Sequence, residues 1–386
     1  MFVAVSGHSE DIDTLSAFAE VREQCEGELE GKPPQAGLLF AAIDFEHQEL
    51  LDAINDAWPG IELIGCTTDG ELSSCLGFRE DSISLLLLAS DTIDFASGLG
   101  RRLSEDALAA CMQAAEQARA KTELKPRLCI TTRESLTISG QQTVEALSKA
   151  LGEDIDLFGG RAADHRKYES TLQFCGRKVV SDSVPILILS GPLFYSIGVA
   201  SGWKPIGDPG VITRAQGDMV YEIDGAPAVE FYHRLLGKEF KLSVDIPLII
   251  LNDAGKPEYL RPSTGDVNEE TGAIKYMSDV PQGVMAQVAI VNRAAILEGC
   301  EESVRNALRR FPDIKKPEAG VIVSCSARRN LLGTKAPEEF RILREQVGQD
   351  LPLCGFYSAG EIGPQKTDSS KSIMHYETFT MLLLGT

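Results

Sequence analysis

The heptapeptide Gly65-Cys66-Thr67-Thr68-Asp69-Gly70-Glu71 recurs near the end of the chain as Gly355-Phe356-Tyr357-Ser358-Ala359-Gly360-Glu361. Both stretches follow the pattern G-x-x-[ST]-x-G-E. A third stretch, Gly159-Gly160-Arg161-Ala162-Ala163-Asp164-His165, lies between them and places His165 where the other two carry Glu71 and Glu361. A repeat at long spacing indicates an internally repeated architecture. A repeated position whose chemistry changes is a candidate functional site.

Each heptapeptide belongs to a unit with one predicted order of elements: an apolar strand, a helix, a second apolar strand ending in the glycine loop, and a closing apolar strand. The predicted helices cover residues 47–58, 139–151 and 337–347. Apolar strands without clean alternation are typical of strands covered on both faces. We expect the loop-linked second and closing strands to pair antiparallel. The sequence therefore predicts an α/β fold in which mixed β-sheets are layered with helices.

The turn-like run at 221–225 separates two blocks of similar length, and we place a domain boundary there, between residues 1–221 and 222–386. Between the first and second units, residues 103–121 are rich in alanine. They predict a helix with Ser104 as its N-cap.

Composition excludes several classes of function. The chain has 386 residues and a formal net charge of −20, which disfavours contact with nucleic acids and with anionic membranes. No apolar run is long enough to cross a bilayer. The first residues lack the basic and apolar regions of a signal peptide, so we expect a cytoplasmic protein.

Four stretches resemble the signature regions of FIST domain proteins: 63–72, 199–207, 221–228 and 355–362. The resemblance covers an N-terminal and a C-terminal FIST domain. It implies a sensory module that binds a small ligand, with amino acids among the proposed ligands, rather than an enzyme. A homodimer is one option for the oligomeric state.

Some stand-alone bacterial FIST proteins of about this length are haem-binding nitric oxide sensors that act on histidine kinases or cyclic-di-GMP enzymes. For this subset the resemblance implies a haem b group, which needs an axial ligand such as a neutral imidazole. Among five histidines we rank His165 first as the metal ligand. Arg161, Arg166 and Lys167 are then candidates for the haem propionates, and Tyr168 for stacking or a hydroxyl contact. The alternative to a haem site is that His165 and its basic neighbours form a solvated turn between strands.

The glycine loops offer a second hypothesis. Glu71 and Glu361, with the hydroxyls of Thr67, Thr68 and Ser358, are candidates to bind an amino acid without haem. A structural alternative is that each glutamate pins its own loop. A third hypothesis is a hydrolase-like enzyme with Glu71 or Glu361 as the acid–base group.

Overall fold

The three heptapeptides lie in three copies of one structural unit in the computed structural model, which describes residues 1–29, 31–365 and 371–386. The first unit comprises β1 (Phe2–Ser9), α1 (Thr14–Leu29), β2 (Ala36–Ala41), α2 (His47–Ala57), β3 (Glu62–Thr67), β4 (Glu71–Ser73), β5 (Gly77–Arg79) and β6 (Ile83–Ser90). The second comprises β7 (Asp94–Arg101), α3 (Ala107–Arg119), β8 (Pro126–Arg133), α4 (Gly140–Leu151), β9 (Asp156–Arg161), β10 (Gln173–Cys175), β11 (Lys178–Val180) and β12 (Ser183–Ser190).

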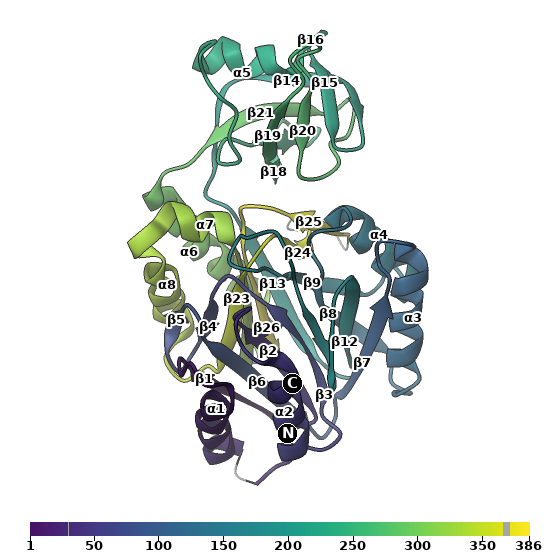
Figure 1. Cartoon of the computed structure of the whole chain (residues 1–386). Coiled ribbons are helices and arrows are strands. Elements are labelled where there is room, and N and C mark those ends of the chain that lie inside the picture. The colour runs from purple at the N-terminus through teal and green to yellow at the C-terminus, as the bar shows by residue number, and fades with distance from the viewer. Residues whose placement is uncertain (30, 366–370) are drawn as a thin grey trace.

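The third unit has the same order, with a smaller lobe inserted after its first strand. It comprises β13 (Phe194–Ala200), α6 (Arg293–Arg310), β22 (Ala319–Cys325), α7 (Ser326–Leu332) and the short 3-10 helix Gly333–Lys335, α8 (Pro337–Val347), β23 (Leu353–Ser358), β24 (Glu361–Pro364), β25 (Ser372–His375) and β26 (Phe379–Gly385). The lobe comprises β14 (Lys204–Gln216), β15 (Met219–Ile223), β16 (Ala226–Pro227), α5 (Ala228–Leu236), β17 (Leu248–Leu251), β18 (Pro257–Arg261), β19 (Ser263–Val267), β20 (Ile274–Tyr276) and β21 (Met285–Ile290). Figure 1 shows the lobe standing above the three-unit body.

Each unit forms a six-stranded mixed sheet with one common strand order. In the first unit, β2 and β3 are parallel, and the closing strand β6 lies between β1 and β2, antiparallel to both. The mixed α/β fold predicted from the sequence is confirmed. The expected antiparallel pairing of the second and closing strands is wrong. In the first unit the closing strand β6 pairs with β1 and β2 and not with β3.

The last two strands at one edge of each sheet form a hairpin that comes from a different unit. The hairpin β10–β11 of the second unit joins the first sheet at β3, and β24–β25 of the third unit joins the second sheet at β9. The hairpin β4–β5 of the first unit completes the cycle at β23. This exchange interlocks the three units. The predicted boundary between 221 and 222 lies within β15, inside the lobe's sheet, and so does not separate the sheets of the body.

Both faces of the three sheets are buried. The inner faces of the three sheets meet in one apolar core. Each sheet contributes a phenylalanine to it: Phe40 of β2, Phe158 of β9 and Phe356 of β23. The outer faces are covered by the helix pairs α1–α2, α3–α4 and α6–α8. Burial on both faces explains why the strand sequences are apolar without alternation. Helix α3 begins later than expected: Asp106, not Ser104, is its N-cap, and its side chain accepts the Ala109 N–H at 2.9 Å.

The first glycine of each heptapeptide lies at one equivalent point of its sheet. Gly65, Gly159 and Gly355 each face a residue of the parallel neighbouring strand, in matching registers. A Cβ atom at these positions would lie only 2.0, 1.9 and 2.2 Å from the carbonyl oxygen of that facing residue. The repeated glycine is therefore required by close approach of the backbones.

Candidate functional site

The three heptapeptide loops meet at the centre of the body and hold one another through a closed ring of backbone hydrogen bonds. The bonds run from the Asp69 N–H to the Tyr357 carbonyl (3.1 Å), from the Ala163 N–H to the Thr67 carbonyl (2.8 Å) and from the Ala359 N–H to the Arg161 carbonyl (3.4 Å). Each donor holds the fifth position of its heptapeptide and each acceptor the third. The ring marks an approximate threefold axis through the body.

A cavity of about 220 Å³ lies at this ring. Asp69, Ala163 and Ala359, the three donors of the ring, all line it. The lobe contributes Asp245 and Met277, so the cavity lies between the body and the lobe. We call it the axial cavity. Its location at loops that follow the carboxyl ends of strands is typical of ligand sites in α/β proteins.

Glu377, in the turn between β25 and β26, is the most unusual residue that lines the axial cavity. Its side chain is buried, and neither carboxylate oxygen has a hydrogen-bond partner among the described residues. Burial, with smaller contributions from Asp245 and Glu361, raises its pKa well above the ordinary value. Its backbone has a φ of 59°, a left-handed conformation that is costly for glutamate. A buried acid without hydrogen-bond partners, in a costly backbone conformation, destabilises the fold. Its presence therefore points to a functional role for Glu377.

Two further lining residues carry buried polar atoms without a partner among the described residues: Oδ1 of Asp69 and Nε of Arg161. Burial raises the pKa of Asp69. The Arg161 guanidinium is held in place, because Nη1 lies 3.4 Å from the Tyr376 hydroxyl and Nη2 donates to the Ser135 carbonyl. Buried polar groups normally have partners, so these atoms are the ones that a polar ligand would satisfy.

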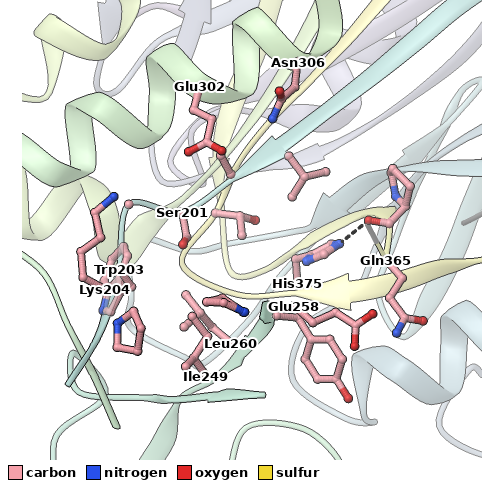
Figure 2. A pocket seen from close by; sticks show the side chains of 18 of the residues that line it. Ser201, Trp203, Lys204, Ile249, Glu258, Leu260, Glu302, Asn306, Gln365 and His375 are labelled. Carbon is pink, nitrogen blue, oxygen red and sulfur yellow. Dashed lines mark hydrogen bonds between the residues drawn. The ribbon is translucent and has the colours of Figure 1, made fainter. Parts of the chain in front are cut away.

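A second cavity of about 310 Å³ lies where the lobe joins the body, and Figure 2 shows its lining. Ile249 and Leu260 come from the lobe, and Glu302 and Asn306 project from α6. Its buried His375 is already satisfied, since Nε2 lies 2.9 Å from the Pro364 carbonyl oxygen. None of the buried unpartnered atoms found among the described residues belongs to this cavity. The axial cavity is therefore the stronger candidate.

The structure divides the predicted haem residues into two groups. Arg161, Arg166 and Tyr168 line the axial cavity, whereas His165 and Lys167 do not. His165 points to the side, where its Nε2 lies 3.3 Å from Asp81 Oδ1 and 3.8 Å from Asp44 Oδ2. Lys167 lies 4.0 Å from the same Asp44.

His165 is also not the counterpart of the two glutamates. In the sheets, Gly65 pairs with Phe174, Gly159 with Ile362 and Gly355 with Leu72. The residues that directly precede these three partners are Gln173, Glu361 and Glu71, respectively. Gln173 is therefore the residue of the second unit that is equivalent to Glu71 and Glu361. The heptapeptide alignment was wrong at its last position because the second unit has a longer loop before its hairpin. This loop, which contains His165, is pinned by Asp164, whose carboxylate accepts the N–H groups of residues 168–170.

The surroundings of His165 do not fit a haem group. A haem needs an apolar slot beside its axial ligand and cationic partners for its propionates. Here the imidazole faces two exposed aspartates, which would repel propionates. Asp44, Asp81 and His165 bring one ligand atom each to within 4.8 Å of one another, an arrangement that suits a small cation better than an anionic porphyrin.

Glu71 and Glu361 occupy equivalent buried networks. Glu71 accepts the Ser82 hydroxyl at 2.5 Å and the Thr68 hydroxyl, while Glu361 accepts the Thr378 hydroxyl at 2.8 Å and the Ser358 hydroxyl at 3.1 Å. Neither glutamate lines the axial cavity. These contacts support the structural alternative, in which each glutamate pins its own loop.

Of the other residues predicted to bind an amino acid, only Ser358 lines the axial cavity. Thr67 accepts the Leu172 N–H at 3.1 Å, and Thr68 is bonded to Glu71.

We expect the Glu361→Gln variant to change how stability depends on pH. Burial raises the pKa of Glu361 from 4.5 to about 8, against the opposing hydrogen bonds from Thr378 and Ser358. Between these values the folded state keeps a proton that the unfolded state releases, so this group makes stability fall as pH rises. Urea unfolding at several pH values should show a shallower decline for Glu361→Gln, by up to about 1.4 kcal/mol per pH unit. The exposed Glu153→Gln variant should keep the wild-type slope; an unchanged slope in Glu361→Gln would contradict the expectation.

Sequence reasoning missed Asp69, Asp245 and Glu377 as site residues. A signal for Asp69 was present, since the fifth position of the heptapeptide is alanine in the other two units (Ala163 and Ala359) and charged only here. No comparable signal exists for Asp245 or Glu377, which reach the cavity from the lobe and from a turn outside the repeated motif.

Among the described residues, no helix is both long enough and apolar enough to span a membrane. The chain is 24% identical over 373 residues to an uncharacterized protein of Mycobacterium tuberculosis, an alignment that covers 91% of this chain and 92% of the relative. An uncharacterized protein of Methanocaldococcus jannaschii is 27% identical over 215 residues, covering 52% of this chain and 40% of the relative.

Two solved structures align over most of the chain at low similarity. A cyanuric acid hydrolase from A. caulinodans aligns with a TM-score of 0.41 and 9% identity, over 100% of this chain and 99% of the other. A chorismatase aligns with a TM-score of 0.36 and 9% identity, over 93% of this chain and 95% of the other.

Two family descriptions match successive parts of the chain. The FIST N domain matches residues 35–226, and the FIST C domain matches residues 228–364. Together they cover the heptapeptide loops, the lobe and the residues of the axial cavity from Asp69 to Ala359. FIST domains are in general sensory, ligand-binding domains of signal transduction. This chain belongs to the FIST family, with one FIST N domain followed by one FIST C domain.

Proposed function

We propose that this chain is a cytoplasmic sensory receptor that binds a free amino acid in the axial cavity. The observation that carries the proposal is Glu377, a buried carboxylate without a partner among the described residues, in a strained backbone conformation at a cavity wall. An ammonium group supplies the hydrogen-bond donors that such a carboxylate lacks.

The other end of an amino acid has a partner at the same wall. Arg161 is held beside Tyr376, which directly precedes Glu377, and its Nε–H has no partner among the described residues. A guanidinium is well suited to a carboxylate. The cavity of about 220 Å³ lies below the roughly 300–1,000 Å³ typical of sites for drug-sized ligands, which favours a ligand as small as a single amino acid.

The cavity also suggests how binding produces a signal. Its walls come from the body and from the lobe, where Asp245 lies close enough to influence Glu377. A ligand held between them favours the arrangement in which lobe and body are closed. A ligand shifts such an equilibrium only by its difference in affinity for the two arrangements.

The Glu377→Gln variant tests this proposal. We expect a mixture of the twenty common amino acids to raise the melting temperature of the wild type, since a ligand at a hundred times its Kd stabilises by about 2.7 kcal/mol. Glu377→Gln should lose this rise, yet be at least as stable as the wild type without ligand at neutral pH, because it removes an acid whose pKa burial raises and whose protonation in the folded state costs stability there. Differential scanning fluorimetry measures both quantities.

Glu302→Gln is the matched control, because Glu302 lines the other cavity (Figure 2) and should keep the ligand-induced rise. Loss of the rise in Glu302→Gln but not in Glu377→Gln would move the ligand to that cavity. No rise with any amino acid in the wild type would contradict the proposal.

The haem and nitric oxide hypothesis stays a prediction, and the surroundings of His165 speak against it. A Soret band in protein from haem-supplied cells, lost in His165→Ala, would support it. A histidine kinase or a cyclic-di-GMP enzyme as the partner, and a homodimer, also stay predictions from the resemblance. Catalysis by Glu71 or Glu361 has little support, because both are buried in complete hydrogen-bond networks away from the cavity.

A further inference from the structure

The acids of the axial cavity are not equivalent. The Asp164 carboxylate already accepts the backbone N–H groups of residues 168–170. Asp245 is only partly buried, so water can solvate it. Asp69 and Glu377 are both buried and both have carboxylate oxygens without partners among the described residues. The cavity thus contains two buried acids with oxygen atoms that cationic groups of a ligand can bind.

The cavity wall itself holds few basic residues that could pair with these two acids. Arg161 and Arg166 are the arginines that line the cavity, and Arg166 is exposed. Arg161 is fixed beside Tyr376, which directly precedes Glu377 in the chain. A neutral amino acid would pair its carboxylate with Arg161 and its ammonium with Glu377, and would leave Asp69 Oδ1 without a partner. A cationic side chain that reaches Asp69 Oδ1 adds a charge-assisted hydrogen bond that a neutral amino acid cannot make.

Asp69 and Glu377 also lie in different electrostatic surroundings. The Ser326 side chain, Arg329, His165 and the Arg166 N–H act on Asp69, whereas Asp245, Glu361 and Arg328 act on Glu377. Asp69 lies in the loop between β3 and β4, and Glu377 lies in the turn between β25 and β26. Two separate anchoring points for cations favour a ligand with two separate cationic groups.

Resting on the proposed function, we infer that the ligand is a basic amino acid, whose side-chain cation pairs with Asp69 while its α-carboxylate and α-ammonium pair with Arg161 and Glu377. Asp69 is then the residue that determines specificity. The repeat supports this role: the equivalent positions in the same ring of hydrogen bonds are Ala163 and Ala359. The scaffold therefore tolerates alanine here, and Asp69 is not required for the ring, to which it contributes only its backbone N–H.

Isothermal titration of the full chain with lysine and with norleucine tests the inference, because norleucine has the same carbon chain without the ε-ammonium. We expect lysine to bind the wild type at least about tenfold more tightly, the usual range for a hydrogen bond to a charged group. In Asp69→Ala this ratio should fall to near one, with norleucine binding retained. Glu377→Gln should weaken both ligands.

Other ligands separate the possible failures. Cadaverine, which keeps two ammonium groups but lacks the carboxylate, should bind more weakly than lysine; equal affinity would show a diamine site and overturn the inference. Equal binding of lysine and norleucine, or preference for glutamate, would also overturn it while leaving an amino-acid receptor in place. Only the failure of every amino acid to bind would remove the proposed function itself.

Discussion

Replacing Gly159 by alanine is expected to prevent stable folding. The new Cβ would lie 1.9 Å from the Thr131 carbonyl oxygen on the parallel neighbour β8, less than any normal contact. The residue also has a φ of 148°, which side chains rarely adopt. The contact is with backbone in the middle of a sheet covered on both faces, so no side-chain movement can relieve it.

We expect Gly159→Ala to lose more than about 4 kcal/mol of unfolding free energy, in the range of severe steric defects. The measurement is urea unfolding, or soluble yield where the variant does not fold. Gly27→Ala is the matched control: Gly27 lies in α1 with open space around its Cβ position, and alanine there should stabilise by about 0.5–1 kcal/mol. A Gly159→Ala protein with a wild-type unfolding midpoint would show that the strands are further apart than described.

The Arg328→Met variant is expected to have the next largest effect. Arg328 is fully buried in α7 and donates to Glu339 Oε1 from Nε at 2.9 Å and from Nη2 at 2.7 Å. It also donates to the carbonyls of Ser201 and Ile296, at the start of the lobe connection and on α6. One side chain therefore fixes α7, whose first residues Ser326 and Ala327 line the axial cavity.

Without the guanidinium, Glu339 stays buried with only the hydroxyls of Tyr357 and Ser324 as donors. We expect a loss of about 3–5 kcal/mol in chemical unfolding, typical of breaking a buried ion pair. The exposed Arg341→Met variant breaks ion pairs with Glu338 and Glu345 and should lose less than about 1 kcal/mol.

The double variant Arg328→Met/Glu339→Leu should recover part of the stability, since it leaves no buried charge. If Arg328→Met alone unfolds like the wild type, the pair is not buried as the structure has it.

Local patterns determined the secondary structure within each unit. The helices predicted at 47–58, 139–151 and 337–347 are α2, α4 and α8, because each has apolar residues at helical spacing and a clear stop signal. The first strand and helix of the chain, β1 and α1, were missed. The amphipathic signal of α1 is weak, and its burial is decided by packing against the first sheet.

The repeated glycines were also readable in the sequence, because a backbone that approaches a neighbouring carbonyl admits no side chain and leaves a glycine at each copy. The sequence therefore determined that a threefold repeat exists and where its loops lie. Alignment of the motif alone failed at its end, where His165 was taken for the counterpart of Glu71 and Glu361. Only the strand register shows that the counterpart is Gln173.

The site itself was decided by tertiary structure. Hairpin exchange brings the three loops to one axis, and insertion of the lobe places the cavity between Asp69, Arg161 and Glu377. These contacts join residues from about ninety to about three hundred positions apart in the chain, and no local preference of the chain encodes such pairings. A sequence records which groups must be buried, but which buried groups remain without partners depends on how the sheets assemble.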